Sequence, residues 1–208
     1  MKGNVYCYCS DNPICKEDKN GHDFEWCGNS YEYGEPKKRG KNSTRKPLSE
    51  FLDEIYQMIG IWKYPEDGKG CSYGYVDCTG LYEFPMYVYF DKKSLEHYHA
   101  DGNNTDRIYE FGLYNGDVRG CKGKGIITSE TELVPGMALF IYDYDEKKKK
   151  NHLLHMAIYI GNYFEGYENA IIESVESGVV IRTLSESERI HEAQYTYCGY
   201  FRGIDYDK

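Results

Sequence analysis

The second half of the chain is divided into short apolar segments separated by turns, and this pattern limits the fold more than any other feature of the sequence. Polar and apolar residues alternate within each segment, as they do along half-buried strands. The predicted strands are Met137–Asp143 and residues 153–161, 170–174, 178–184 and 196–203. Strands that follow one another this closely pair antiparallel, so we predict an antiparallel sheet of about five strands.

An amphipathic helix precedes the sheet. The apolar residues that recur at helical spacing are Leu48, Phe51, Leu52, Ile55, Tyr56 and Ile59. Pro47 and Gly60 mark the two ends, which predicts a helix of about 13 residues. Because helices packed on an antiparallel sheet make an α+β domain, we assign residues 47–206 to one such domain.

Residues 1–46 form a different segment, polar and rich in cysteine, that ends in a basic linker. It contains Cys7, Cys9, Cys15, His22 and Cys27. Their spacing lacks the paired Cys-x-x-Cys pattern of dependable zinc sites, so we interpret them as reduced cysteines, with zinc as the alternative. The basic run at residues 37–46 is interpreted as a solvated linker, with a nucleic-acid role as the alternative.

The net charge of −9 argues against nucleic acid as the main partner, because phosphate binding depends on a surplus of lysine and arginine. The N-terminus lacks the apolar run of a secretory signal peptide. No stretch approaches the length of about 18 apolar residues that a membrane span needs. We therefore expect synthesis in the cytoplasm, no membrane partner, and free thiols among the eight cysteines.

Cys78 lies in a glycine-framed turn, directly after Asp77 and before residues at helical spacing. A cysteine at a helix N-terminus is activated, because unpaired N–H groups and the helix dipole favour the thiolate. The alternative is a small buried apolar residue. Pro85 predicts that this helix kinks or ends early, because proline removes a hydrogen bond from a helix interior.

Histidine opens the strand predicted downstream, at His155. A cysteine nucleophile, a histidine base and a polar residue that orients the imidazole need to meet only in space. His152 is a rival base, and we prefer His155 because the alternating run begins there. The glycine-rich stretch Gly120–Gly125 has no preceding strand and is predicted to be a flexible loop.

Five motifs, taken in order, resemble the signature of the NlpC/p60 papain-like cysteine peptidases, which are related to the CHAP amidases. They are Asp77–Leu81, Val134–Phe140, His155–Gly161, Ile171–Glu173 with Gly178–Val179, and Tyr197–Tyr206. Together they cover about residues 47–206. The resemblance implies a papain-like fold, in which a helix bearing the nucleophile packs on an antiparallel sheet.

The resemblance also implies roles for single residues. Cys78 would be the nucleophile, His155 the base and Glu173 the third member, chosen by its place on the strand after His155. Relatives more often carry histidine or asparagine there, and the alternative for Glu173 is a strand-end glutamate that points at water. Tyr64 would lie beside the thiol and help to bind the scissile carbonyl.

Two further residues are assigned to the substrate side of this site. Asp77 adjoins the nucleophile, and we expect it to bind local backbone N–H groups rather than to transfer protons. His99 is expected to border the cleft; a metal shared with His97, or plain loop polarity, are the alternatives.

The implied activity is cleavage of peptidoglycan stem peptides, either between D-γ-glutamate and a diamino acid or at the muramoyl-alanine amide. We expect no cofactor and no metal. Such proteins act on the cell wall after lysis or as part of a phage particle, as lysins or tail-associated hydrolases. The alternatives are a non-catalytic phage module on the same fold and a papain-like acyltransferase or other amide hydrolase.

Overall fold

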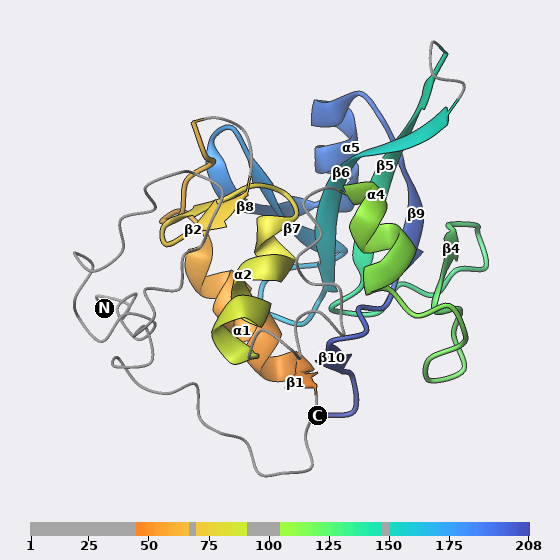
Figure 1. Cartoon of the computed structure of the whole chain (residues 1–208), viewed down its shortest axis with the longest axis horizontal. Coiled ribbons are helices and arrows are strands. Elements are labelled where there is room, and N and C mark those ends of the chain that lie inside the picture. The colour runs from red at the N-terminus through yellow and green to blue at the C-terminus, as the bar shows by residue number, and fades with distance from the viewer. Residues whose placement is uncertain (1–44, 67–69, 91–104, 147–149) are drawn as a thin grey trace.

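The computed structural model describes residues 45–66, 70–90, 105–146 and 150–208, which form an antiparallel sheet with helices packed around it (Figure 1). The predicted α+β class is therefore confirmed. The N-terminal cysteines with His22, and both His97 and His99, lie outside the described residues.

The main sheet has six antiparallel strands in the order β4-β9-β5-β6-β7-β8. Their bounds are β4 Lys124–Ile126, β5 Ala138–Asp145, β6 Lys150–Gly161, β7 Ala170–Val175, β8 Gly178–Thr183 and β9 Tyr195–Gly199. The centre of the sheet is β5, β6 and β7, and most of their apolar side chains are buried; Tyr144 and Leu154, near the β5–β6 connection, are exposed. All five predicted strands are present.

Two predictions about this sheet need correction. The sixth strand, β4, lies partly in the glycine-rich stretch predicted to be a loop, because Lys124, Gly125 and Ile126 pair with β9. The last predicted strand ends at Gly199 rather than at residue 203. Beyond Gly199 the N–H of Tyr200 still donates to Gly123 O at 2.7 Å, and Phe201 forms an isolated antiparallel bridge with Leu113.

The predicted first helix is α1, Leu48–Met58. It buries one stripe, Phe51, Leu52, Ile55 and Met58. Gly60 ends the helical segment with a φ of +70°, a conformation that glycine adopts without strain. The backbone N–H of Gly60 then donates to Val179 O in β8 at 3.0 Å, so the end of α1 is tied to the sheet.

The helix after Cys78 is α2, Gly80–Tyr89, and it lies beside α1 (Figure 1). Pro85 is inside it, yet the helix continues to Tyr89, so the prediction of an early end is wrong. Phe84, Pro85 and Met86 are all buried. We infer that this packing outweighs the hydrogen bond that the proline removes.

Three shorter helical elements complete the domain: α4 Thr105–Arg107, the π-helical turn η4 Ile108–Gly112, and α5 Leu184–His191. Asp106 holds α4 against β6, because its Oδ1 accepts the backbone N–H of Leu153 at 2.9 Å. The helix α5 follows β8 and lies over the sheet beside β6 (Figure 1). The described helices include none with the length and apolar character needed to cross a bilayer.

The two ends of the described domain meet in a parallel pair, β1 Lys46–Pro47 with β10 Ile204–Asp205. Lys46, which the basic run placed in a solvated linker, is 1% exposed. Its Nζ lies 2.7 Å from Glu54 Oε1 on α1 and 4.6 Å from the ring centroid of Tyr89 on α2. Lys46 is buried because β1 pairs with β10. The local run of basic residues does not indicate this burial.

Candidate active site

Asp77 fixes the turn that carries Cys78. Its Oδ1 accepts the backbone N–H of Gly80 at 2.7 Å and the hydroxyl of Thr79 at 2.9 Å, while its Oδ2 accepts the N–H of Gly70 at 2.7 Å. The carboxylate therefore stabilises the first turn of α2 and links it to the hairpin of β2 Cys71–Ser72 and β3 Tyr75–Val76. This agrees with the expectation that Asp77 binds local backbone N–H groups.

Cys78 lies two residues before the first residue of α2, and it is partly exposed. The backbone N–H groups of Met156 and Thr79 lie close enough to its sulfur to lower the pKa of the thiol. Met156 lies just beyond the last β6–β7 pair, Ala157 with Glu173, and directly follows His155. The thiol therefore reaches the sheet at the residue next to the predicted base.

The thiol is not activated in the way that its position near a helix N-terminus predicted. Burial, and next the charge of Asp77, raise the pKa of Cys78 to about 12. The N–H groups of Met156 and Thr79 lower the pKa only in part. Since both desolvation and a neighbouring anion penalise the thiolate, Cys78 is a neutral thiol at pH 7.

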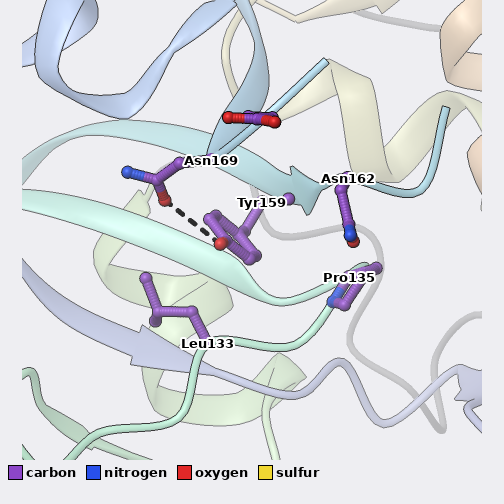
Figure 2. A pocket seen from close by; sticks show the side chains of 7 residues that line it. Leu133, Pro135, Tyr159, Asn162 and Asn169 are labelled. Carbon is purple, nitrogen blue, oxygen red and sulfur yellow. Dashed lines mark hydrogen bonds between the residues drawn. The ribbon is translucent and has the colours of Figure 1, made fainter. Parts of the chain in front are cut away.

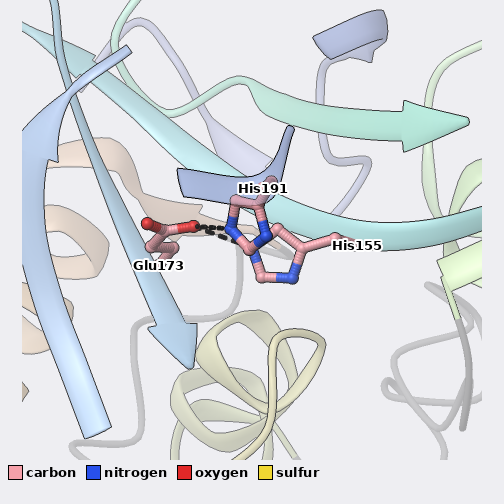
Figure 3. Close-up of side chains that lie close together, drawn as sticks. All are labelled: His155, Glu173 and His191. Carbon is pink, nitrogen blue, oxygen red and sulfur yellow. Dashed lines mark hydrogen bonds and ion pairs between the residues drawn. The ribbon is translucent and has the colours of Figure 1, made fainter. Parts of the chain in front are cut away.

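His155 and Glu173 lie on the same face of neighbouring strands. His155 Nε2 is 2.9 Å from Glu173 Oε2, and Figure 3 shows the second ring nitrogen pointing away from the carboxylate. An ionised carboxylate can only accept hydrogen bonds, so Nε2 carries the proton. Nδ1 is then the nitrogen of His155 that can accept a proton from elsewhere.

Glu173 is completely buried, which excludes the alternative of a glutamate that points at water. Its Oε2 accepts from His155 Nε2, from His191 Nε2 at 2.8 Å, from Ser187 Oγ at 3.1 Å and from Tyr195 OH at 3.3 Å. Arg182 Nε lies 3.1 Å from Oε1. Burial alone would raise the pKa of Glu173, but the hydrogen bonds from the two histidines outweigh it and hold the pKa well below its usual range.

The base is neutral in the resting site. Burial lowers the pKa of His155 below its ordinary value, and the hydrogen bond and charge of Glu173 oppose this only in part. The neighbouring His191 ring and the Arg182 guanidinium lower the pKa of His155 further. Among the described residues, no direct hydrogen bond joins Cys78 to the ring of His155. The sulfur of Cys78 instead lies near the backbone of Met156, the residue that follows His155 in β6. The resting pair is thus a neutral thiol and a neutral imidazole.

The structure brings Tyr64 to the same place. The pKa of Tyr64 is raised to about 12, first by burial and then by electrostatic interaction with the neighbouring Cys78 and Asp77. A neutral tyrosine hydroxyl beside the thiol is a suitable donor to a developing oxyanion. His99 cannot be placed, because it lies outside the described residues.

The rival base, His152, is in another environment. Its Nδ1 lies 2.6 Å from Asp106 Oδ2, and the imidazole is 50% exposed. Neither the thiol of Cys78 nor the carboxylate of Glu173 is its partner among the described residues. This placement favours His155 as the base.

The helix α5 contributes to the site and was not predicted from the sequence. This helix begins after Thr183, whose side chain accepts the N–H of Glu186 at 3.2 Å. The pattern Thr-x-x-Glu is a recognised helix start and could have revealed the helix. Ser187 and His191 are four residues apart, so they share one face of α5, the face that meets Glu173.

The cluster has donor atoms suited to a metal ion. One ligand atom each from His155, Glu173 and His191 lie within 4.8 Å of one another. Two imidazole nitrogens and one carboxylate oxygen are a common ligand set for transition metals.

A separate pocket of about 350 Å³ lies toward the C-terminal end of β6 (Figure 2). It is lined by Leu133, Pro135, Tyr159, Gly161, Asn162, Glu168 and Asn169. Tyr159 OH donates to Asn169 Oδ1 at 3.1 Å across it. None of the candidate catalytic residues lines this pocket, so it is not the cleft of the cysteine site.

Comparison with known proteins adds no relative: neither protein-family models nor curated proteins give a match to this chain.

Proposed function

We propose that this protein is a cysteine-dependent amide hydrolase, with Cys78 as nucleophile, His155 as base and Glu173 as the residue that orients the base. The observation that carries the proposal is the 2.9 Å hydrogen bond from His155 Nε2 to the fully buried Glu173, which leaves Nδ1 as the basic nitrogen. An imidazole held in one tautomer by a carboxylate is the arrangement that a nucleophilic thiol needs.

The chemistry starts from the neutral pair. As Cys78 Sγ attacks the carbonyl carbon, its proton passes to Nδ1 of His155, and Glu173 stabilises the imidazolium that forms. The imidazolium then gives this proton to the leaving amine, which leaves a thioester on Cys78. Water, deprotonated by the same imidazole, releases the acid and restores the thiol.

The carbonyl oxygen becomes an anion during attack and needs hydrogen-bond donors. The backbone N–H of Cys78 and the hydroxyl of Tyr64 are the proposed donors. Tyr64 suits this role because its raised pKa, about 12, keeps the hydroxyl protonated at neutral pH.

The proposed fold family is the papain-like NlpC/p60 type, and the proposed substrate is a peptidoglycan stem peptide. Support comes from the five ordered motifs and from the order of elements, in which the helix after Cys78 precedes the strands that carry His155 and Glu173. The proposed setting is the cell wall, reached after lysis or on a phage particle.

The test is release of muropeptides from peptidoglycan sacculi, with products identified by mass spectrometry. We expect the wild type to release stem fragments or free stems, and Cys78→Ala to release none. His155→Ala should lower the rate by roughly 10²- to 10⁴-fold, because it removes the general base.

His152→Ala is the matched control, since it removes an exposed imidazole of the same strand and should retain most of the activity. Loss of activity in His152→Ala together with retention in His155→Ala would overturn the assignment of the base. Equal product release by wild type and Cys78→Ala would exclude the thiol mechanism.

A further inference from the structure

Two imidazoles and one carboxylate converge from separate elements on a single point (Figure 3). His155 comes from the central strand β6, Glu173 from β7, and His191 from the last residue of α5. Both histidines direct the same ring nitrogen, Nε2, at the same carboxylate oxygen, Oε2, at 2.9 and 2.8 Å. A catalytic base needs one such carboxylate, but it does not need a second histidine.

The separations fit the coordination geometry of a transition metal. Ligand atoms about 2.0–2.1 Å from an ion are about 2.9 Å apart when they meet at right angles, and about 3.4 Å apart in a tetrahedron. The two N–O separations of 2.9 and 2.8 Å are compatible with adjacent corners of an octahedral site, and all three ligand atoms lie within 4.8 Å of one another. Sets of imidazole and carboxylate with open positions suit iron, cobalt, nickel and zinc.

The surroundings of the carboxylate resemble the outer shell of a metal ligand. Arg182 Nε lies 3.1 Å from Oε1 as an ion pair, while Ser187 and Tyr195 donate hydrogen bonds to Oε2, and these contacts orient the carboxylate. The imidazoles of His155 and His191 are 13% and 22% exposed, which leaves the cluster open to solvent on the histidine side. The ion-paired Arg182 reduces the negative charge, and this limits the affinity for a cation.

We propose that His155, Glu173 and His191 bind one divalent transition-metal ion through Nε2, Oε2 and Nε2. Each ring moves its single proton from Nε2 to Nδ1 when the ion binds, so neutral rings release no proton. The proposal of binding stands apart from the proposed hydrolase. A consequence that rests on the hydrolase is that the ion inhibits it, because Nδ1 of His155 is then protonated and cannot accept the proton of Cys78.

The test is titration of the reduced full-length chain with Co²⁺, followed by calorimetry and by visible absorption. We expect the wild type to bind one Co²⁺ more than either His191→Gln or Glu173→Gln. Gln can still donate a hydrogen bond from position 191, and it binds Co²⁺ poorly. The spectrum of the Co²⁺ ion that only the wild type binds should have no sulfur-to-cobalt charge-transfer band. The absence of this band distinguishes the ion from any Co²⁺ bound by the N-terminal cysteines.

His152→Gln is the control, because it removes a histidine outside the cluster, and it should keep the full stoichiometry. The proposal is overturned if the wild type and both cluster variants, folded by circular dichroism, bind the same number of Co²⁺ ions. It is also overturned if His152→Gln loses the same ion.

Activity is a second and independent readout. Zn²⁺ or Co²⁺ should inhibit the hydrolase reversibly, with a chelator restoring the rate. Binding that depends on His191, in a protein that releases no muropeptide, would support the metal site while contradicting the proposed function. Muropeptide release that the ion does not inhibit, without any binding that depends on His191, would support the proposed hydrolase and contradict the metal site.

Discussion

At the scale of single residues, Glu173 sets the properties of the candidate site. It is a fully buried carboxylate that is surrounded by two imidazoles, two hydroxyls and one guanidinium. Arg182 already offsets its charge, so the carboxylate stabilises the imidazolium of His155 less than an isolated carboxylate would. The low pKa of His155 follows from this balance together with its burial.

Arg182 and Glu173 should therefore move the pH profile of hydrolysis in opposite directions. Activity needs neutral His155, so in the wild type the acidic limb of kcat/KM should lie below the ordinary histidine pKa of 6.5. Arg182→Gln removes a positive charge and should raise the pKa of His155, so the limb moves to higher pH. Glu173→Gln removes the partner that favours imidazolium, so the limb moves to lower pH and kcat/KM falls by roughly 10²- to 10⁴-fold.

The pH profile of each variant and the titration of His155 by NMR would check this. Arg189→Gln removes an exposed positive charge from α5 and should leave the limb in place. A limb that moves to lower pH in Arg182→Gln would contradict the electrostatic account.

At the scale of elements, the start of α2 is fitted tightly against the β2–β3 hairpin. A Cβ added to Gly80 would lie 2.9 Å from Cys71 Cβ, 3.0 Å from Val76 Cβ and 3.2 Å from Gly70 O. These contacts are shorter than normal packing distances, and two of them are to atoms next to the backbone. The position of Cys78 therefore depends on the absence of a side chain at Gly80.

Gly80→Ala should displace the first turn of α2 and with it Cys78. We expect destabilisation of about 1–3 kcal/mol from overpacking, although alanine favours helices. The rate of muropeptide release should fall even under conditions in which the variant remains folded, because the thiol and His155 must stay aligned. Urea unfolding and muropeptide release would measure the two effects.

Gly116→Ala is the matched control, because a Cβ there would meet nothing within 4 Å. It should change stability by no more than about 0.5 kcal/mol. Equal stability and activity for Gly80→Ala and the wild type would show that the turn can relax.

At the scale of the whole molecule, the C-terminal residues connect parts of the domain that are far apart in the sequence. The hydroxyl of Tyr206 donates to Gly136 O at 2.9 Å and accepts the N–H of Phe201 at 3.0 Å. The next two residues toward the N-terminus, Ile204 and Asp205, pair with Lys46 and Pro47 before α1. Tyr206 thus joins the turn before β5 to the chain after β9.

Tyr206→Phe should lower the free energy of unfolding by about 1–3 kcal/mol, because a buried N–H and a buried carbonyl each lose a hydrogen bond. Thermal and urea unfolding would measure the loss. Tyr144→Phe removes a hydroxyl from an exposed tyrosine and should change stability by no more than about 0.5 kcal/mol. A Tyr206→Phe protein as stable as the wild type would mean that water satisfies both groups.

Helices and strands with a local periodic pattern could be predicted from the sequence. The spacing of Phe51, Leu52 and Ile55 predicted α1, and alternation predicted the strands β5 to β9, because both periodicities follow from backbone geometry. The sequence also predicted that Asp77 binds neighbouring N–H groups, since these lie within a few residues. The roles of Cys78, His155 and Glu173 remain proposals that the geometry supports.

Features that depend on contacts between distant segments could not be predicted from the sequence. The partners of Glu173 come from β6, β8, α5 and β9, and no local pattern brings His191 or Arg182 to that carboxylate. The state of Cys78 was likewise decided by burial against β6, which raises its pKa against the helix effect. The solvation of Lys46 and the continuation of α2 past Pro85 could not be predicted for the same reason, because burial and packing are set by the surrounding chain rather than by sequence neighbours.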